Sequence, residues 1–114
     1  MIPSIQDVYL MRVYFKGVSG DFKVRPVLLI DFDEELQLFT IVEITSVPPK
    51  MPPGYYDKFK EPVTNWEESG LDEPSYVKCK NIHRVDPTRL LKKIGSLNTI
   101  DFDNIIEKII LYNS

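Results

Sequence analysis

Two nearly continuous apolar runs, separated by a short acidic segment, constrain the fold of this 114-residue chain most strongly. The runs span residues 24–32 and 36–45, and the acidic segment Asp33-Glu34-Glu35 lies between them. Each run has the length of a buried strand, and a polar connection of three residues is short enough for a hairpin. The pattern therefore predicts an antiparallel hairpin in this part of the chain.

Further strands are expected on both sides of this hairpin. Residues 7–13 are rich in β-branched and aromatic side chains and are followed by a glycine loop at residues 17–20. Residues 76–84 have the alternation of another strand. The proline-rich residues 48–54 cannot continue a ladder, so the chain is expected to leave the sheet there and return after a polar excursion that ends near Pro74. An excursion of this length in a small domain is usually functional or mobile.

Two helices are expected at the end of the chain. Asp86 suits the N-cap of the first helix, Pro87 suits its first position, and Gly95 suits its end. The second helix begins near Asp101 and carries isoleucines at helical spacing. Strands followed by terminal helices, without a βαβ rhythm, predict a mainly β fold with C-terminal helices. We expect one domain over residues 1–114, a small SH3-like barrel of curved antiparallel strands.

Composition argues against several classes of function. The net charge of −3 is unlike that of a general nucleic-acid coat protein. No apolar stretch approaches the roughly 20 residues that span a bilayer, and the N-terminal segment lacks the regions of a signal peptide, so a cytoplasmic protein without membrane association is expected. One cysteine and one histidine make an internal disulfide and a zinc site improbable. Without a glycine-rich phosphate-binding motif, we expect no cofactor.

Strand alternation over residues 76–84 predicts one strongly basic face. Lys78, Lys80 and Arg84 lie on that face, whereas Cys79 and His83 lie on the other. A lone histidine on such a face is more often a satisfied, partly buried residue than a general base. The cysteine is interpreted as a small hydrophobic side chain, because nothing in the sequence places a base beside it.

Arg25 is placed where a guanidinium can bind a phosphate. It precedes Pro26 at the mouth of the first apolar run, and its forked donors can bind two non-bridging oxygens. Alternation along residues 36–45 indicates that Thr45 faces outward, and the hydroxyls of Thr45 and Ser46 can donate to the same phosphate. Because a ribose carries its own nucleophile, such a set can support RNA cleavage by positioning and charge stabilisation alone. The alternatives are a surface salt bridge for Arg25 and a plain strand end for Thr45.

Five segments, in order along the chain, together resemble the MazF/PemK family of toxin endoribonucleases. They comprise residues 7–9, the glycine loop, and residues 24–30, 42–46 and 76–80. Residues 82–90 also resemble the family's last strand and following helix. The resemblance implies an SH3-like barrel that dimerises and is neutralised by an antitoxin protein. It also implies cleavage of single-stranded RNA without metal, by attack of the 2′-hydroxyl to leave a 2′,3′-cyclic phosphate. Carried over to this sequence, the family's catalytic pair is Arg25 and Thr45.

The basic face and the excursion supply the candidate RNA-binding residues besides Ser46. Some members of the family have an arginine and an aspartate where this chain has Lys78 and Lys80, and lysine can still bind a phosphate as a point charge. The aromatic side chains of the excursion can stack on splayed bases and so set the cut sequence. These aromatic residues are Tyr55, Tyr56 and Trp66. The alternative is that they pin an irregular loop to the barrel.

Two functions of other classes stay open at this point. One is a non-catalytic SH3-like module, a degenerate toxin that grips RNA or a protein tail without cutting it. The other is a domain that interacts only with proteins. The sequence itself offers no confident general base for a nuclease.

Overall fold

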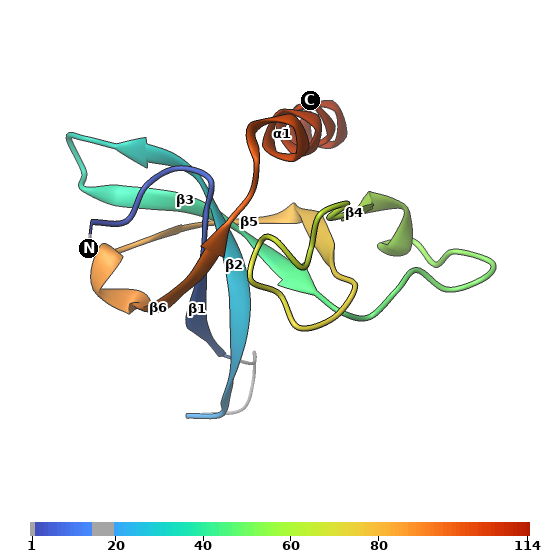
Figure 1. Cartoon of the computed structure of the whole chain (residues 1–114), viewed down its shortest axis with the longest axis horizontal. Helices are drawn as coiled ribbons and strands as arrows, with labels where there is room; N and C mark the ends of the chain where they lie inside the picture. Colours follow the sequence, from blue (N-terminus) through green and yellow to red (C-terminus); the bar gives the residue numbers. More distant parts are fainter. Residues whose placement is uncertain (1, 15–19) are drawn as a thin grey trace.

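The hairpin predicted from the two apolar runs forms the centre of a six-stranded antiparallel sheet (Figure 1). The computed structural model describes residues 2–14 and 20–114, so most of the predicted glycine loop at residues 17–20 lies outside the described residues. The strand order is β4-β5-β3-β2-β1-β6, and every neighbouring pair is antiparallel. The strands are β1 (Asp7–Tyr14), β2 (Phe22–Asp33), β3 (Leu38–Thr45), β4 (Lys60–Pro62), β5 (Tyr76–Val85) and β6 (Leu90–Ser96).

The two central strands are mostly apolar in their middle because their side chains there contribute to clusters on both faces of the sheet. Leu28 and Val42 belong to one cluster, which is covered by the helix α1 (Thr99–Asn113). Leu29 and Ile41 belong to a second cluster on the opposite face. Burial on both faces explains why these runs lack the alternation of a strand that has one side in water.

Cys79 lies in the cluster beneath α1 and is completely buried. Burial raises the pKa of its thiol to about 12, so the reactive thiolate is disfavoured. The interpretation of this cysteine as a small hydrophobic side chain is confirmed.

The prediction of the first of the two helices is wrong. Asp86 does cap a turn, since its side chain accepts a hydrogen bond of 2.9 Å from Thr88 N, but the turn is only the 3-10 helix η2 (Pro87–Arg89). The chain then continues as β6 and pairs with the free edge of β1. Sheet pairing satisfies the backbone of this segment and overrides the local cap signals, so Gly95 lies inside a strand.

The second predicted helix is confirmed as α1, which begins two residues before Asp101. Asn98 caps it by accepting a 2.8 Å hydrogen bond from Asp101 N. The Asp101 carboxylate in turn accepts bonds of 3.1 Å from both the backbone N and Nδ2 of Asn65, which ties the helix to the excursion. Neither α1 nor any other helix in the described ranges is long and apolar enough to cross a membrane.

The predicted mainly β, antiparallel class is confirmed, but strand pairing does not close the sheet. Within residues 2–14 and 20–114 no ladder joins the edge strands β4 and β6. Residues 63–75 lie between these edges instead. Val63 N donates a hydrogen bond to Ser75 O beside β5, and Gly70 lies against the backbone of β6. A Cβ atom on Gly70 would lie 1.9 Å from Ile94 O, so only glycine permits this approach.

We expect Gly70→Ala to lower the free energy of unfolding more than Gly20→Ala does. Both glycines have left-handed backbones, with φ of +86° and +82°, but an added Cβ at Gly20 meets nothing within 4 Å. The shared backbone strain is about 1–2 kcal/mol, and the overlap with Ile94 adds roughly 1–3 kcal/mol at Gly70 alone. Urea unfolding of the two variants measures the difference. Equal losses would contradict the close approach of this loop to β6.

Candidate functional site

Arg25 and Thr45 line one pocket of about 640 Å³. The hairpin register explains why they meet, since Val27 lies opposite Glu43. Arg25 is two residues before Val27 and Thr45 is two residues after Glu43, which is toward the same end of the sheet because the strands are antiparallel. Side chains two positions apart share a face of a strand. The structure therefore brings the two predicted catalytic residues together, and Lys78 from β5 lines the same pocket.

Thr45 is buried, with 7% of its surface exposed, which corrects the prediction that it faces outward. It lies on the opposite face of β3 from Ile44, which belongs to the cluster beneath α1. The hydroxyl oxygen accepts a 3.1 Å hydrogen bond from Val47 N. The hydroxyl proton is still able to donate to a bound group, because accepting a bond leaves the O–H donor unused.

The other polar residues predicted to bind RNA surround this pocket. Ser46 lines an adjoining pocket of about 310 Å³ that also includes Arg25 and Thr45. Lys78 and Lys80 line a small hollow on the other side. The Lys80 ammonium lies 5.0 Å from the ring centre of Phe59, in a cation–π contact.

Two of the three predicted aromatic residues lie at the pocket, and the third does not. Tyr56 lines it, and Tyr55 contacts Tyr56 edge to face with ring centres 4.9 Å apart. Both rings are more than 60% exposed and so available for stacking. Trp66 instead packs against the core cluster beneath α1. That position suits the alternative of pinning the excursion, and contact of Trp66 with RNA stays a prediction.

Asp57 fixes the loop that carries the two tyrosines. Its Oδ2 accepts hydrogen bonds from Gly54 N at 2.8 Å and from Lys50 N at 3.2 Å, and its Oδ1 pairs with Lys60 Nζ at 3.2 Å. The hydrogen bond from Gly54 is the main cause that lowers the pKa of Asp57 below its ordinary value, against the opposing effect of burial. Sequence analysis did not find this residue.

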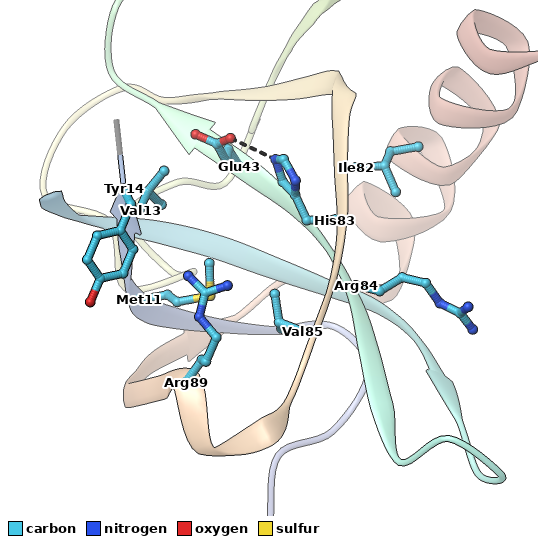
Figure 2. Close-up of a pocket in the computed structure, with 9 residues that line it drawn as sticks. All are labelled: Met11, Val13, Tyr14, Glu43, Ile82, His83, Arg84, Val85 and Arg89. Carbon is cyan, nitrogen blue, oxygen red and sulfur yellow. Dashed lines mark hydrogen bonds and ion pairs between the residues drawn. The ribbon is translucent and has the colours of Figure 1, made fainter. Parts of the chain in front are cut away.

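Glu43 was also missed as a site residue. It is the only charged residue among residues 36–45, and that isolation was the signal available in the sequence. Its Oε2 lies 3.1 Å from His83 Nε2 and accepts a 3.4 Å bond from Asn81 Nδ2. Glu43 lines both the main pocket and a second pocket of about 520 Å³, into which His83 also projects (Figure 2).

The prediction that His83 shares a face with Cys79 is wrong. The pairing of β5 with β3 shifts register, because Val42 lies opposite Ile82 whereas Ile44 lies opposite Val77. This irregularity reverses the side-chain alternation along β5. The His83 side chain is consequently 51% exposed at the pocket, while Cys79 stays in the core. Arg84 points its guanidinium away from Glu43 and His83 (Figure 2) and pairs with Asp33 at 2.9 Å, so it does not share the face of Lys78 and Lys80.

The chain resembles known proteins in sequence pattern and in fold. Residues 6–112 match the family described as PemK-like, MazF-like toxin of type II toxin–antitoxin system. A comparison with curated protein sequences gives no match. MazE-MazF from Deinococcus radiodurans is similar in structure, with a TM-score of 0.71 and 14% identity over 99% of this chain and 97% of that one. Mycobacterium tuberculosis toxin MazF-mt6 gives a TM-score of 0.63 and 23% identity over 90% and 91%.

We expect Asp57→Asn to lower the free energy of unfolding at neutral pH but not in acid. A carboxyl group whose pKa is lowered by folding stabilises the native state above its unfolded pKa of about 3.9. That contribution disappears as the pH falls through the lower folded pKa. Urea unfolding at pH 7 and at about pH 2.5 measures the change, with Asp103→Asn on the exposed face of α1 as the control. A difference between Asp57→Asn and the unsubstituted protein that is equally large at both pH values would disprove this account.

Proposed function

Because the chain belongs to the PemK-like, MazF-like toxin family of type II toxin–antitoxin systems, we propose that it is an endoribonuclease that cleaves single-stranded RNA. The observation that supports this function best is the shared pocket of Arg25 and Thr45. A guanidinium and a hydroxyl there can hold one phosphate between the central strands. Lys78 adds a third donor at the rim of the same pocket.

In the proposed reaction the ribose 2′-oxygen attacks the adjacent phosphorus, and the bond from phosphorus to the 5′-oxygen breaks. The product strand ends in a 2′,3′-cyclic phosphate. Arg25 binds the non-bridging oxygens through two N–H donors and stabilises the charge that they gain in the transition state. Thr45 donates a hydrogen bond from its hydroxyl to the same group. The nucleophile belongs to the substrate, so the reaction has no chemical requirement for a metal ion.

Contacts beyond the reacting phosphate hold the RNA in place. Ser46, Lys78 and Lys80 are positioned to bind neighbouring phosphates from the two hollows beside the main pocket. Tyr55 and Tyr56 offer exposed rings on which flanking bases stack, and each stacked base contributes about 1–3 kcal/mol to affinity. Because only unpaired bases can stack in this way, such contacts favour single-stranded RNA over duplex RNA.

The family also suggests two protein partners. Toxins of type II systems are paired with an antitoxin protein, and the Deinococcus radiodurans structure contains MazE together with MazF. We accordingly propose that an antitoxin neutralises this protein and that the protein forms a homodimer. Light scattering of the purified chain tests the dimer directly.

We expect the protein to cut mixed-sequence single-stranded RNA in EDTA and to leave a 2′,3′-cyclic phosphate. Arg25→Ala should slow cleavage by about 100-fold to 1000-fold, because it removes the donors that stabilise the transition state. Lys92→Ala is the matched control, since it removes one positive charge from an exposed site on β6. Gel analysis and mass spectrometry of the products measure both effects.

The same experiment separates the alternative functions. Intact RNA with the unsubstituted protein, no different from Arg25→Ala, would refute the nuclease. RNA binding that persists and weakens with salt would then support a non-catalytic module. No salt-dependent RNA binding would support a domain that interacts only with proteins.

A further inference from the structure

Glu43 is a buried carboxylate in a strand whose neighbouring positions are apolar. Only 7% of its surface is exposed, and Val42 and Ile44 on either side are completely buried. Removing a carboxylate from water destabilises a fold unless the charge is well paired. Within the described residues, its only ion-pair partner is His83, and no lysine or arginine pairs with it. A residue that served packing alone would be apolar at this position, so the carboxylate points to a function.

The carboxylate is aimed at the two pockets with one oxygen still available. Oε2 takes both contacts, the one with His83 Nε2 and the one with Asn81 Nδ2. Figure 2 shows the other oxygen turned away from the imidazole ring. Among the described residues, every buried side-chain oxygen or nitrogen has a hydrogen-bond partner. The second oxygen of Glu43 has no partner among these residues, so it is accessible rather than enclosed. It can accept a proton from a bound molecule.

Glu43 is also close to the place of the proposed chemistry. It lies two residues before Thr45 on the same face of β3, and both line the pocket with Arg25. Residues two apart along a strand are separated by about 7 Å. A phosphate held by Arg25 and Thr45 therefore places its own ribose within reach of the glutamate side chain.

We propose that Glu43 is the general base that accepts the proton of the 2′-hydroxyl, and that His83 is the positioning residue that orients it. This inference rests on the proposed nuclease function. As the bond from the 2′-oxygen to phosphorus forms, the hydroxyl proton passes to the free oxygen of Glu43. The bond from phosphorus to the 5′-oxygen breaks, and water gives a proton to that oxygen. Glu43 then releases its proton to the hydroxide, which restores both groups.

The other proton acceptors near the pocket are less suitable. Asp57 also lines it, but hydrogen bonds or the pair with Lys60 occupy both of its oxygens, and it fixes the tyrosine loop. Cys79 is enclosed in the core, away from the pocket. Arginine is a poor base because it stays protonated, so Arg25 is restricted to holding charge. The Nε2 atom of His83 already contacts Oε2 of Glu43, and its side chain projects from the neighbouring strand. His83 is therefore a partner of the carboxylate rather than the base.

The test compares Glu43→Gln with the unsubstituted protein in single-turnover cleavage of an RNA that the latter cuts. Loss of a general base should slow cleavage by about 100-fold or more. Binding of the same RNA with a 2′-deoxyribose at the cut should change by less than about threefold, because glutamine keeps the shape and polarity of the side chain. An RNA with sulfur as the 5′ leaving atom needs no acid, and it should not restore the rate. Restoration would show that Glu43 acts as the acid and would overturn the proposal.

Two variants of the half-exposed His83 give an independent test that does not depend on the folding of Glu43→Gln. His83→Gln keeps an N–H donor for Glu43 and should retain most of the activity, whereas His83→Leu should lose about tenfold. Asp33→Asn is the matched control, because it removes a carboxylate paired with Arg84 at 2.9 Å on an exposed part of the hairpin. Equal rates for His83→Leu and the unsubstituted protein would overturn the positioning role.

The outcomes also separate this inference from the function on which it rests. Cleavage by Glu43→Gln at the unsubstituted rate, while Arg25→Ala is inactive, would overturn the inference and leave the nuclease standing. Failure of the unsubstituted protein to cleave any RNA would overturn both. Loss of activity in Glu43→Gln with normal RNA binding and normal thermal unfolding is the expected result.

Discussion

The antiparallel register between β2 and β3 is the constraint on which the rest of the structure depends. It sets Val27 opposite Glu43 and so brings Arg25 and Thr45 to one end of one face. Apolar residues on both faces hold that register, because a slip by one residue would turn Ile44 into the pocket and Thr45 into the core. The packing of the hairpin therefore specifies the site as well as the fold.

Local patterns were sufficient to predict the features that arise from neighbouring residues. The hairpin follows from two apolar runs with a short acidic connection, and α1 follows from helical spacing. The pairing of Arg25 with Thr45 was implied by the family resemblance, and the register between β2 and β3 brings the two residues to one pocket. The features that were missed depend on contacts between distant segments. The β6 strand forms because β1 offers a free edge, and His83 reaches Glu43 because of a register irregularity opposite β3. The sequence of β6 does not show that β1 has a free edge, and the sequence around His83 does not show the register irregularity.

The long excursion has two structural parts with different roles. Residues 63–75 are joined to the fold by the contact of Gly70 with β6 and by the hydrogen bonds of Asn65 with Asp101. The earlier part is organised by Asp57, and it presents Tyr56 at the pocket. One part thus lies where strand pairing stops, between the edges of the sheet, and the other presents exposed tyrosine rings at the pocket.

The mixed charge of the pocket agrees with the proposed division of labour between Arg25 and Glu43. A carboxylate close to a phosphate would ordinarily weaken binding by repulsion between like charges. During the proposed reaction the phosphate gains about one negative charge, and Glu43 loses its charge by accepting the proton. The total charge facing Arg25 therefore stays nearly constant while its centre moves toward the phosphorus. Arg25, which lies three residues after the first residue of β2, is then placed to favour the transition state over the ground state. That preference is the condition for a charged group to accelerate a reaction.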